Sequence, residues 1–403
     1  MPKRRSPSRP AVADGLDTRL TEFLAALEKA GYAEKTRRDK RRLITPFIRW
    51  ARKEGIAVAD LDEACAGAFL RCPSRRRYKH RTALHQFLEH LRTTGVVPPR
   101  RYESSPSEML VRRYLDHLRD EQGLCARSME VYSPFVRDFV AERISKPGTG
   151  LDASVVRSYL LDRSRDRSVS FTRLLTAALR SFLRFCFFEG RTPVDLSTAV
   201  PPVRRWRFGA LPSFLTAEQV ERVIAAVDRA TARGRRALAI LLLLARLGLR
   251  AGEIVALELD DIRWGVGELL VRGKGRLHDR LPLLADVGDA LALYLREARG
   301  PSASRRVFLR RHAPRVGLSG PSAVCEVARE ALRRAGLRPV GRVGAHIFRH
   351  SLATKMIRHG ASLAEISQVL RHRSVVTTQL YAKVDLEALR GVALPWPRAE
   401  AQR

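Results

Sequence analysis

The sequence predicts a mainly helical α+β fold, in which two helical modules precede a larger domain with a small β-hairpin. Apolar residues recur at helical spacing through residues 16–200, and the pattern runs twice. Residues 237–245 form an unbroken apolar run, which is typical of a buried central helix. Two short strand-like runs flank a Gly-Lys-Gly turn at residues 273–275, which is typical of a β-hairpin.

The composition is that of a globular protein with a large excess of positive charge. Among 403 residues, 45% are hydrophobic, 75 are Lys or Arg and 42 are Asp or Glu, so the formal net charge is +33. This charge predicts a polyanionic partner, most often nucleic acid. An anionic membrane surface is the alternative, but the sequence shows neither an amphipathic basic helix nor a lipidation motif.

Membrane insertion and secretion are both disfavoured by the sequence. The longest apolar run has nine residues, whereas a membrane span needs about 20. The N-terminus MPKRRSPSRP has no apolar signal region. The five cysteines are scattered and form no C-x-x-C pair, which favours a reducing compartment and argues against a structural zinc site. We therefore expect a cytoplasmic, nucleoid-associated bacterial protein.

The first helical module is predicted to span residues 16–100, after a flexible basic tail at residues 1–15. It opens with the amphipathic segment TRLTEFLAALEKAGY (18–32) and closes with LHQFLEHLRTTG (84–95). Both segments place apolar residues three and four apart, as one face of a helix does.

The second helical module is predicted to span residues 105–200. It opens with MLVRRYLDHLRDEQGL (109–124) and closes with LRSFLRFCFFEG (179–190), which aligns with the end of the first module at an offset of 95. Each module also carries a Pro-Phe pair, in PFIRW (46–50) and PFVRD (134–138). The pattern indicates duplication of a four- or five-helix unit; chance similarity between helices is the alternative.

A basic linker is predicted at residues 201–212, because this segment holds three prolines and three arginines with little periodicity. A larger domain then spans residues 213–381, followed by a C-terminal helix and tail at residues 382–403. Thr216 is expected to cap the first helix of the larger domain. The hairpin follows at residues 268–284.

The later part of the larger domain is expected to return to helix. Helical patterns resume at residue 321, with one end at Gly360 and another near residues 373–374.

The larger domain carries four short motifs with chemically active side chains. In RLGLRAGEIVAL, Arg250 precedes Glu253 by about one helical turn, a spacing that lets the carboxylate fix the guanidinium. Lys274 occupies the hairpin tip and is the single lysine between residues 147 and 354. Lysine can give up a proton near neutral pH when its environment lowers its pKa, whereas arginine cannot.

The other two motifs lie nearer the C-terminus. In AHIFRHSLAT, His346 and Arg349 are three residues apart and so share a helical face. In LRHRSVVTTQLYAKV, Tyr381 follows His372 by nine residues.

Together these side chains suit phosphoryl transfer. Two guanidiniums can clamp the extra charge of a pentacovalent transition state. A tyrosine can act as a covalent nucleophile, although its pKa near 10 demands a base or a strongly positive site. The sequence shows no acidic metal-ligand cluster, so we expect neither a metal nor another cofactor.

Each motif alone has a structural explanation. Arg250 and Glu253 could form a simple ion pair, and Lys274 could be an ordinary turn residue. His372 could end a helix, and Tyr381 could belong to the core. The four motifs occurring together in this order argue against these explanations.

In this order the motifs resemble the tyrosine recombinase (phage integrase) family of site-specific DNA recombinases, over about residues 213–390. That family carries an arginine in G-L-R-x-G-E, a hairpin lysine, an H-x-x-R helix, and a His or Trp nine residues before the tyrosine. The resemblance implies a tyrosine-recombinase catalytic domain behind two helical DNA-binding modules, of which residues 105–200 would be the core-binding domain.

The resemblance also implies a role for each motif residue. Tyr381 would attack the scissile phosphate and form a 3′-phosphotyrosine, while Lys274 would protonate the departing 5′ oxygen. Arg250 and Arg349 would bind the phosphate oxygens. The two histidines would assist, His346 in proton transfer at the nucleophile and His372 through a hydrogen bond to the phosphate.

Members of the family act as tetramers on two DNA sites and pass a C-terminal helix to a neighbour. Residues 384–392 carry an apolar pattern that suits such a helix. The C-terminal tail resembles a branch carried by transposon-like elements, sometimes with sibling recombinases. Two alternative functions remain open: a non-catalytic DNA-binding accessory protein, and a topoisomerase IB-like relaxing activity.

Overall fold

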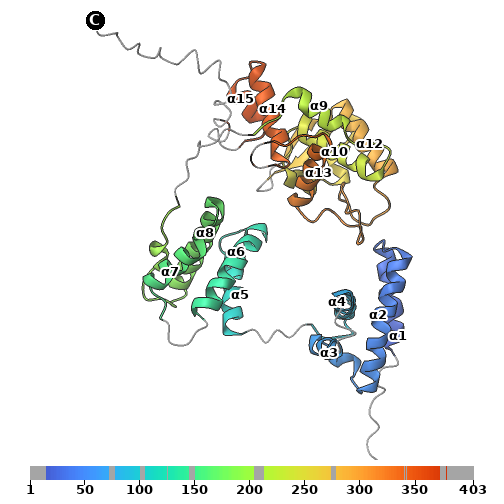
Figure 1. The fold of residues 1–403 in the computed structure, drawn as a ribbon, viewed down its shortest axis with the longest axis vertical. Helices are drawn as coiled ribbons and strands as arrows, with labels where there is room; N and C mark the ends of the chain where they lie inside the picture. The colour runs from blue at the N-terminus through green and yellow to red at the C-terminus, as the bar shows by residue number, and fades with distance from the viewer. Residues whose placement is uncertain are drawn as a thin grey trace, which may run out of the picture. The chain divides into compact units, whose positions relative to one another are not determined.

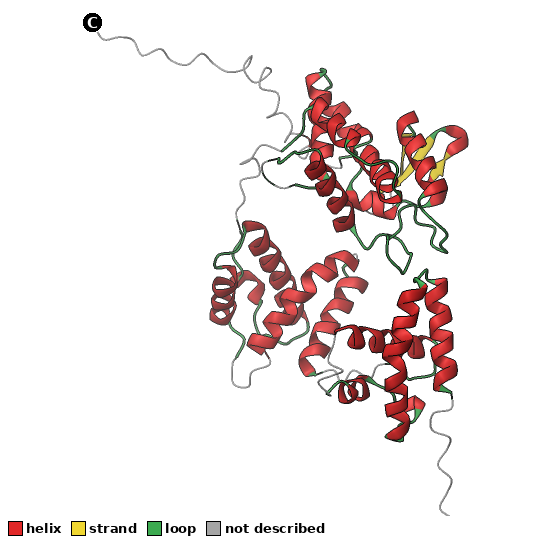
Figure 2. Cartoon of the chain, turned by 45° about the vertical axis from the view of Figure 1, so that its right-hand side comes forward, coloured by secondary structure: helices red, strands yellow, loops and turns green. Residues whose placement is uncertain are grey.

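The computed structural model describes residues 15–71, 78–99, 105–124, 126–144, 150–203, 213–273, 278–339, 341, 343–372 and 378. The chain divides into two compact units, residues 100–209 and residues 1–99 with 210–403. Helices dominate, and the described strands form one small sheet (Figures 1 and 2). None of the described helices is long and apolar enough to cross a membrane. The mainly helical α+β prediction is confirmed.

The described residues between 16 and 99 form four α-helices around a core of their own. The helices are α1 (Leu16–Lys29), α2 (Glu34–Lys53), α3 (Glu63–Phe69) and α4 (Tyr78–Thr93). The opening helix buries the apolar positions expected from its spacing, namely Leu20, Phe23, Leu24 and Leu27. They pack with Phe47 of α2 and Phe87 of α4.

Residues 105–200 contain a second helical group with a separate core. Its helices are α5 (Pro106–Asp120), α6 (Ala126–Phe139), α7 (Ala153–Ser164) and α8 (Val169–Phe188). Leu110, Tyr114 and Leu118 of α5 are buried as expected, while Leu115 is only partly buried.

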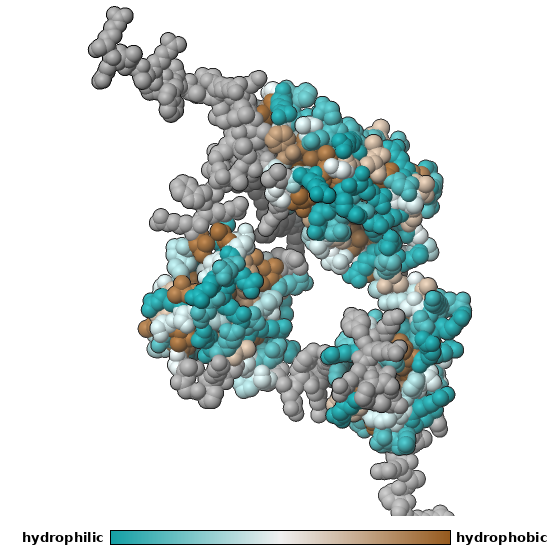
Figure 3. Space-filling view, in the orientation of Figure 1, coloured by the Kyte–Doolittle hydropathy of each residue, from teal (hydrophilic) through white to brown (hydrophobic). Residues whose placement is uncertain are grey.

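Figure 3 shows that the described parts of the chain have a largely hydrophilic surface with scattered apolar patches on the visible face.

The two helical groups end in the same way. Gly95 and Gly190 both adopt a left-handed backbone, with φ of 72° and 66°. In the first group the amide of Val96 donates to the carbonyl of Leu91, and in the second Arg191 donates to Cys186, again at an offset of 95. The second helix of each group also contains its proline, Pro46 or Pro134. These matches agree with the predicted register; the duplication itself stays a prediction.

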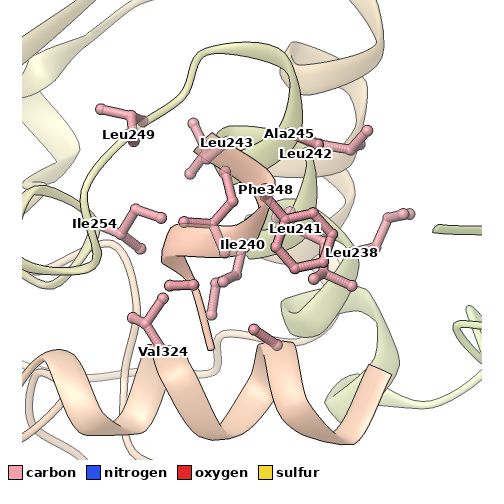
Figure 4. Packing of buried hydrophobic residues seen from close by; sticks show 14 of the residues in the cluster. Leu238, Ile240, Leu241, Leu242, Leu243, Ala245, Leu249, Ile254, Val324 and Phe348 are labelled. Carbon is pink, nitrogen blue, oxygen red and sulfur yellow. The ribbon is translucent and has the colours of Figure 1, made fainter. Parts of the chain in front are cut away.

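The larger domain is built around α10 (Ala232–Arg246), which is buried on nearly all sides. Figure 4 shows its apolar side chains lying against Ile254, Val324 and Phe348. Full burial of one leucine or isoleucine contributes about 1.5–3 kcal/mol, so this helix anchors the domain. The surrounding helices are α9 (Ala217–Ala225), α11 (Ala251–Ala256), α12 (Ala285–Glu297), α13 (Pro321–Arg334) and α14 (His346–Arg358), and α15 (Leu363–Val369) packs on α14.

Local signals in the larger domain agree with the predictions. Thr216 and Gln219 form a reciprocal capping box at the start of α9. Helix α13 begins at Pro321, and α14 ends just before Gly360, whose φ is 82°. The predicted end near residues 373–374 lies outside the described residues.

The predicted hairpin is the main part of a three-stranded antiparallel sheet in the order β1-β2-β3. Strand β2 (Glu268–Arg272) pairs with β3 (His278–Pro282), with Leu270 opposite Arg280. Strand β1 (Ile262–Arg263) was not predicted, because two residues are too short to show a period. The hairpin tip with Lys274 lies outside the described residues, as do most of the linker and residues 381–403.

Candidate functional site

Arg250 lies where the chain leaves the buried helix α10 and enters α11. The Glu253 carboxylate accepts two hydrogen bonds from it, one from the main-chain amide at 2.8 Å and one from Nη1 at 2.7 Å. This is the ion pair expected from their spacing. The Arg250 side chain remains 39% exposed, so part of its guanidinium faces solvent.

Arg349 occupies the first turns of α14 and is 4% exposed. Its guanidinium donates to the carbonyls of Gly248 and Leu370. Gly248 has a φ of 58°, and a Cβ there would lie 2.8 Å from Leu370 Cδ2 and 3.0 Å from Leu352 Cδ2. Glycine therefore suits this turn, because it adopts the left-handed backbone without strain and leaves room for the two leucine side chains.

The end of α15 supplies acceptors to both arginines. The amides of Arg371 and His372 donate to the carbonyls of Gln368 and Ser367, a Schellman ending in which Arg371 has a φ of 54°. Its carbonyl accepts from Arg250 Nη2 at 3.0 Å. Consecutive carbonyls, those of Leu370 and Arg371, thus hold the guanidiniums of Arg349 and Arg250.

The side chain of Arg371 also enters this network, a contact that the sequence reasoning missed. Its Nη2 lies 2.7 Å from Glu253 Oε2, and both side chains are 7% exposed. Burial acts to raise the pKa of Glu253, but Arg371 and Arg250 outweigh it and lower that pKa. No spacing rule could single out Arg371 among so many arginines.

The histidines of the site occupy different surroundings. His346 is the first residue of α14 and is exposed, with its ring 6.4 Å from that of His350. His372 lies beyond α15, where its Nδ1 is 2.7 Å from the hydroxyl of Thr378.

Two of these histidines are neutral at pH 7. Burial, followed by Arg349 and Arg250, lowers the pKa of His372 to about 4. Burial, followed by His346 and Arg349, lowers the pKa of His350 to about 4. Both rings can therefore act as neutral hydrogen-bonding groups.

The structure thus brings Arg250, Glu253, Arg349 and His372 together from three separate segments. His346 opens the same helix that carries Arg349. Lys274 and Tyr381 lie outside the described residues, so their placement stays a prediction. Within the described part of the chain, no three His, Cys, Asp or Glu side chains gather as metal ligands.

Similarity to known proteins identifies the family. Residues 213–387 match the model of the phage integrase family. The chain is also 41% identical over 391 residues to a protein named "Putative integrase/recombinase y4rA" from Sinorhizobium fredii, and the match covers 95% of each chain. The chain belongs to the phage integrase family of tyrosine recombinases.

Solved structures share the fold of this tyrosine recombinase. The XerH site-specific recombinase bound to a palindromic difH substrate has a TM-score of 0.56 at 18% identity, covering 73% of this chain and 98% of that one. A lambda integrase tetramer bound to a Holliday junction has a TM-score of 0.51 at 16% identity, covering 79% and 90%. These likenesses show the fold. The expected family is confirmed by the relative that matches 95% of both chains, so the chain is a DNA recombinase.

Proposed function

We propose that this tyrosine recombinase cleaves and rejoins DNA strands through a 3′-phosphotyrosine intermediate. The observation that carries the proposal is the pair of guanidiniums, Arg250 and Arg349, fixed by consecutive carbonyls at the end of α15. Donors held in place before the reaction stabilise developing charge without reorganisation. Two such donors suit the non-bridging oxygens of a scissile phosphate.

In the proposed cleavage step, the Tyr381 hydroxyl loses its proton to His346, and its oxygen attacks the phosphorus and forms a bond to it. The bond between phosphorus and the 5′ oxygen breaks, and Lys274 gives its proton to that oxygen. Ligation is the reverse, with the 5′-hydroxyl of a partner strand as nucleophile. Because the phosphoester energy is kept in the phosphotyrosine, the proposal needs neither ATP nor a metal.

The proposed histidine roles follow from their surroundings. His346 is exposed at the start of α14, where it can exchange a proton with the nucleophile. His372 is neutral at pH 7 and its Nδ1 lies beside the Thr378 hydroxyl. If Nδ1 accepts from that hydroxyl, Nε2 carries the ring proton and can donate to the phosphate.

The partners proposed for this chain are double-stranded DNA sites and further copies of itself. The net charge of +33 and the DNA-bound structures of similar fold support a DNA partner. We assign residues 16–100 and 105–200 to DNA binding, residues 201–212 to a linker and residues 213–381 to catalysis. The tail at residues 382–403 would pass its helix to a neighbour in a homo-tetramer.

The proposed biological role is movement of a mobile element by integration, excision or transposition. The similarity to an integrase/recombinase over 95% of both chains supports this role. Sibling recombinases of the same element are further candidate partners.

Covalent trapping tests the proposal directly. Wild type and Tyr381→Phe are incubated with nicked duplexes from the ends of the native genetic element, and the products are separated on denaturing gels. We expect a slower DNA-protein band for wild type only, with equal DNA binding by both proteins. Binding without a band from either protein would favour an architectural DNA binder. Relaxation of supercoiled plasmid without partner sites would favour a topoisomerase-like enzyme.

A further inference from the structure

Arg371 occupies a backbone position that normally suits glycine. It follows the C-terminal cap of α15 with a φ of 54°, the left-handed region that L-residues with a side chain rarely adopt. Among the described non-glycine residues, only Asp166 shares a positive φ. A strained position that retains a long side chain calls for a contribution from that side chain.

The Arg371 side chain joins three elements that the sequence keeps far apart. It is 7% exposed and lies 2.7 Å from Glu253 in α11. Its Nε lies 3.7 Å from Asp279 Oδ2 in strand β3, the strand that follows the Lys274 turn. One guanidinium thus donates to Glu253 in α11 and to the carbonyl of Val369 at the end of α15, and it lies within ion-pair distance of Asp279 in the hairpin.

Among the described residues, Arg371 contacts one partner of the Arg250 guanidinium and supplies the other. Glu253 accepts from Arg250 Nη1 through Oε1, and its Oε2 pairs with Arg371 Nη2. The second partner is the carbonyl of Arg371 itself, which accepts from Arg250 Nη2. Rotation of the Glu253 carboxylate would therefore turn Arg250 away from its present direction.

We propose that Arg371 is a positioning residue that aims Arg250 at the scissile phosphate and links its orientation to strand β3 of the hairpin. This inference rests on the proposed function. Arg371 acts through Glu253 and through its own carbonyl. Its guanidinium holds Glu253 Oε2 together with the Arg250 amide, while Asp279 lies within ion-pair distance of the same guanidinium. A misplaced transition-state donor costs rate even where DNA binding is unchanged.

The test is Arg371→Gly, which removes the guanidinium but suits the left-handed backbone. The turn and its carbonyl are therefore expected to persist. We expect the single-turnover rate of covalent complex formation on a nicked duplex to fall about tenfold or more, as for a misplaced active-site group. The dissociation constant for DNA should stay close to wild type. The thermal midpoint should fall, because Glu253 loses a partner at a buried position, so the rate is measured well below the midpoint of the variant. Arg371→Lys, which restores the charge, should recover part of the rate.

Two control variants separate positioning from general effects. Asp166→Gly likewise places glycine at a left-handed position, but outside the site. Arg235→Ala removes a half-buried arginine near the start of α10, where it pairs with Glu297. Both should cleave at the wild-type rate.

A double-mutant cycle shows whether Arg371 acts through Arg250. In an Arg250→Ala background, Arg371→Gly should lower the rate by no more than about twofold, because the group that it positions is gone. The Asp279→Asn change should lower the cleavage rate of the wild-type protein but should not lower the rate of the Arg371→Gly variant further.

Three results would overturn the inference. The first is a cleavage rate for Arg371→Gly within twofold of the wild-type rate. The second is a rate loss from Arg371→Gly that is as large in the Arg250→Ala background as in the wild-type protein. Either would leave the proposed function intact, since wild type still forms the complex. Failure of wild type itself to form the complex, with DNA bound, would overturn both the inference and the proposed function.

Discussion

At the residue scale, main-chain carbonyls do much of the work of orienting the two arginines. Arg349 donates to the carbonyls of Gly248 and Leu370, and Arg250 donates to the carbonyl of Arg371. Carbonyls attract a guanidinium without neutralising it, so positive charge remains for an incoming phosphate. Glu253 is the acidic partner of Arg250, and it is shared with Arg371.

Loss of either arginine is expected to affect catalysis more than binding. Arg250→Ala or Arg349→Ala should lower the covalent-cleavage rate by about 10² or more, the range that single transition-state donors contribute. Affinity for duplex DNA should change little, because a chain with 75 Lys and Arg residues has many other cations available to the DNA phosphates. Rates from trapping gels and affinities from filter binding check this, and unchanged cleavage by a variant removes that arginine from the proposed clamp.

The same two variants should differ in stability. Arg349→Ala leaves two buried carbonyls without these donors, at a cost of about 1–3 kcal/mol for each unsatisfied group. Arg250 is partly exposed, so its loss should cost less. Urea unfolding of both variants checks the order, and a larger loss for Arg250→Ala would contradict it.

Acid should destabilise the protein through its neutral histidines. His372 and His350 have pKa values near 4 in the folded protein, against about 6.5 when unfolded. Between pH 6.5 and 4 the unfolded chain binds protons that the folded chain does not, so stability falls as pH falls. The thermal midpoint of wild type should drop more over this range than that of His372→Asn. An equal drop in both would show that His372 does not contribute.

At the element scale, the turn between α10 and α11 determines whether the site can form. Gly248 lets the chain pass between Leu370 and Leu352 while its carbonyl accepts from Arg349. Helices α10, α14 and α15 therefore meet at one glycine. A side chain there would have to displace the ends of the Leu370 and Leu352 side chains, beside the carbonyls that hold Arg349.

Gly248→Ala is expected to impair both folding and cleavage. The left-handed backbone alone costs about 1–2 kcal/mol for an L-residue, and the new Cβ would add a clash with Leu370. Gly267→Ala is the matched control, because Gly267 has a φ of 65° but nothing within 4 Å of an added Cβ. Thermal midpoints and cleavage rates should both fall further for Gly248→Ala, and similar losses in the two variants would contradict the packing argument.

At the scale of the whole molecule, the net charge of +33 predicts strong dependence of DNA binding on salt. Helix α2 concentrates this charge, since its 20 residues hold nine Lys or Arg and two Asp or Glu. Ile44, Phe47, Ile48 and Ala51 face the core, while Arg38, Arg41, Arg42 and Arg49 are exposed. This helix therefore offers an exposed basic face from the first helical module, on which Arg38 pairs with Glu34 and Arg42 with Asp39.

The salt dependence of binding tests whether that face contacts DNA. Wild type should lose about 10³-fold or more in affinity between 50 and 200 mM salt, as proteins with many phosphate contacts do. Changing Arg41, Arg42 and Arg49 together to Gln should reduce the slope of log K against log salt by up to about 3, near 0.9 for each lost contact. An unchanged slope would remove this face from the DNA interface.

Much of the fold could be predicted from the sequence because its signals are local. The buried helix α10, the capping box at Thr216 and the pairing of Arg250 with Glu253 depend on residues within a few turns of one another. Strand β1 could not be predicted, since its two residues carry no period and are defined only by pairing with β2.

By itself, the sequence determined the helical periodicity, the hairpin, the charge and the order of the motif residues, because each is written in composition or short spacing. Only the tertiary structure decided how the arginines are held. The acceptors at Gly248 and Arg371 lie 101 and 121 residues from the arginines that they bind. Main-chain carbonyls look alike at every position of a sequence, so only packing of α10, α14 and α15 could select these ones.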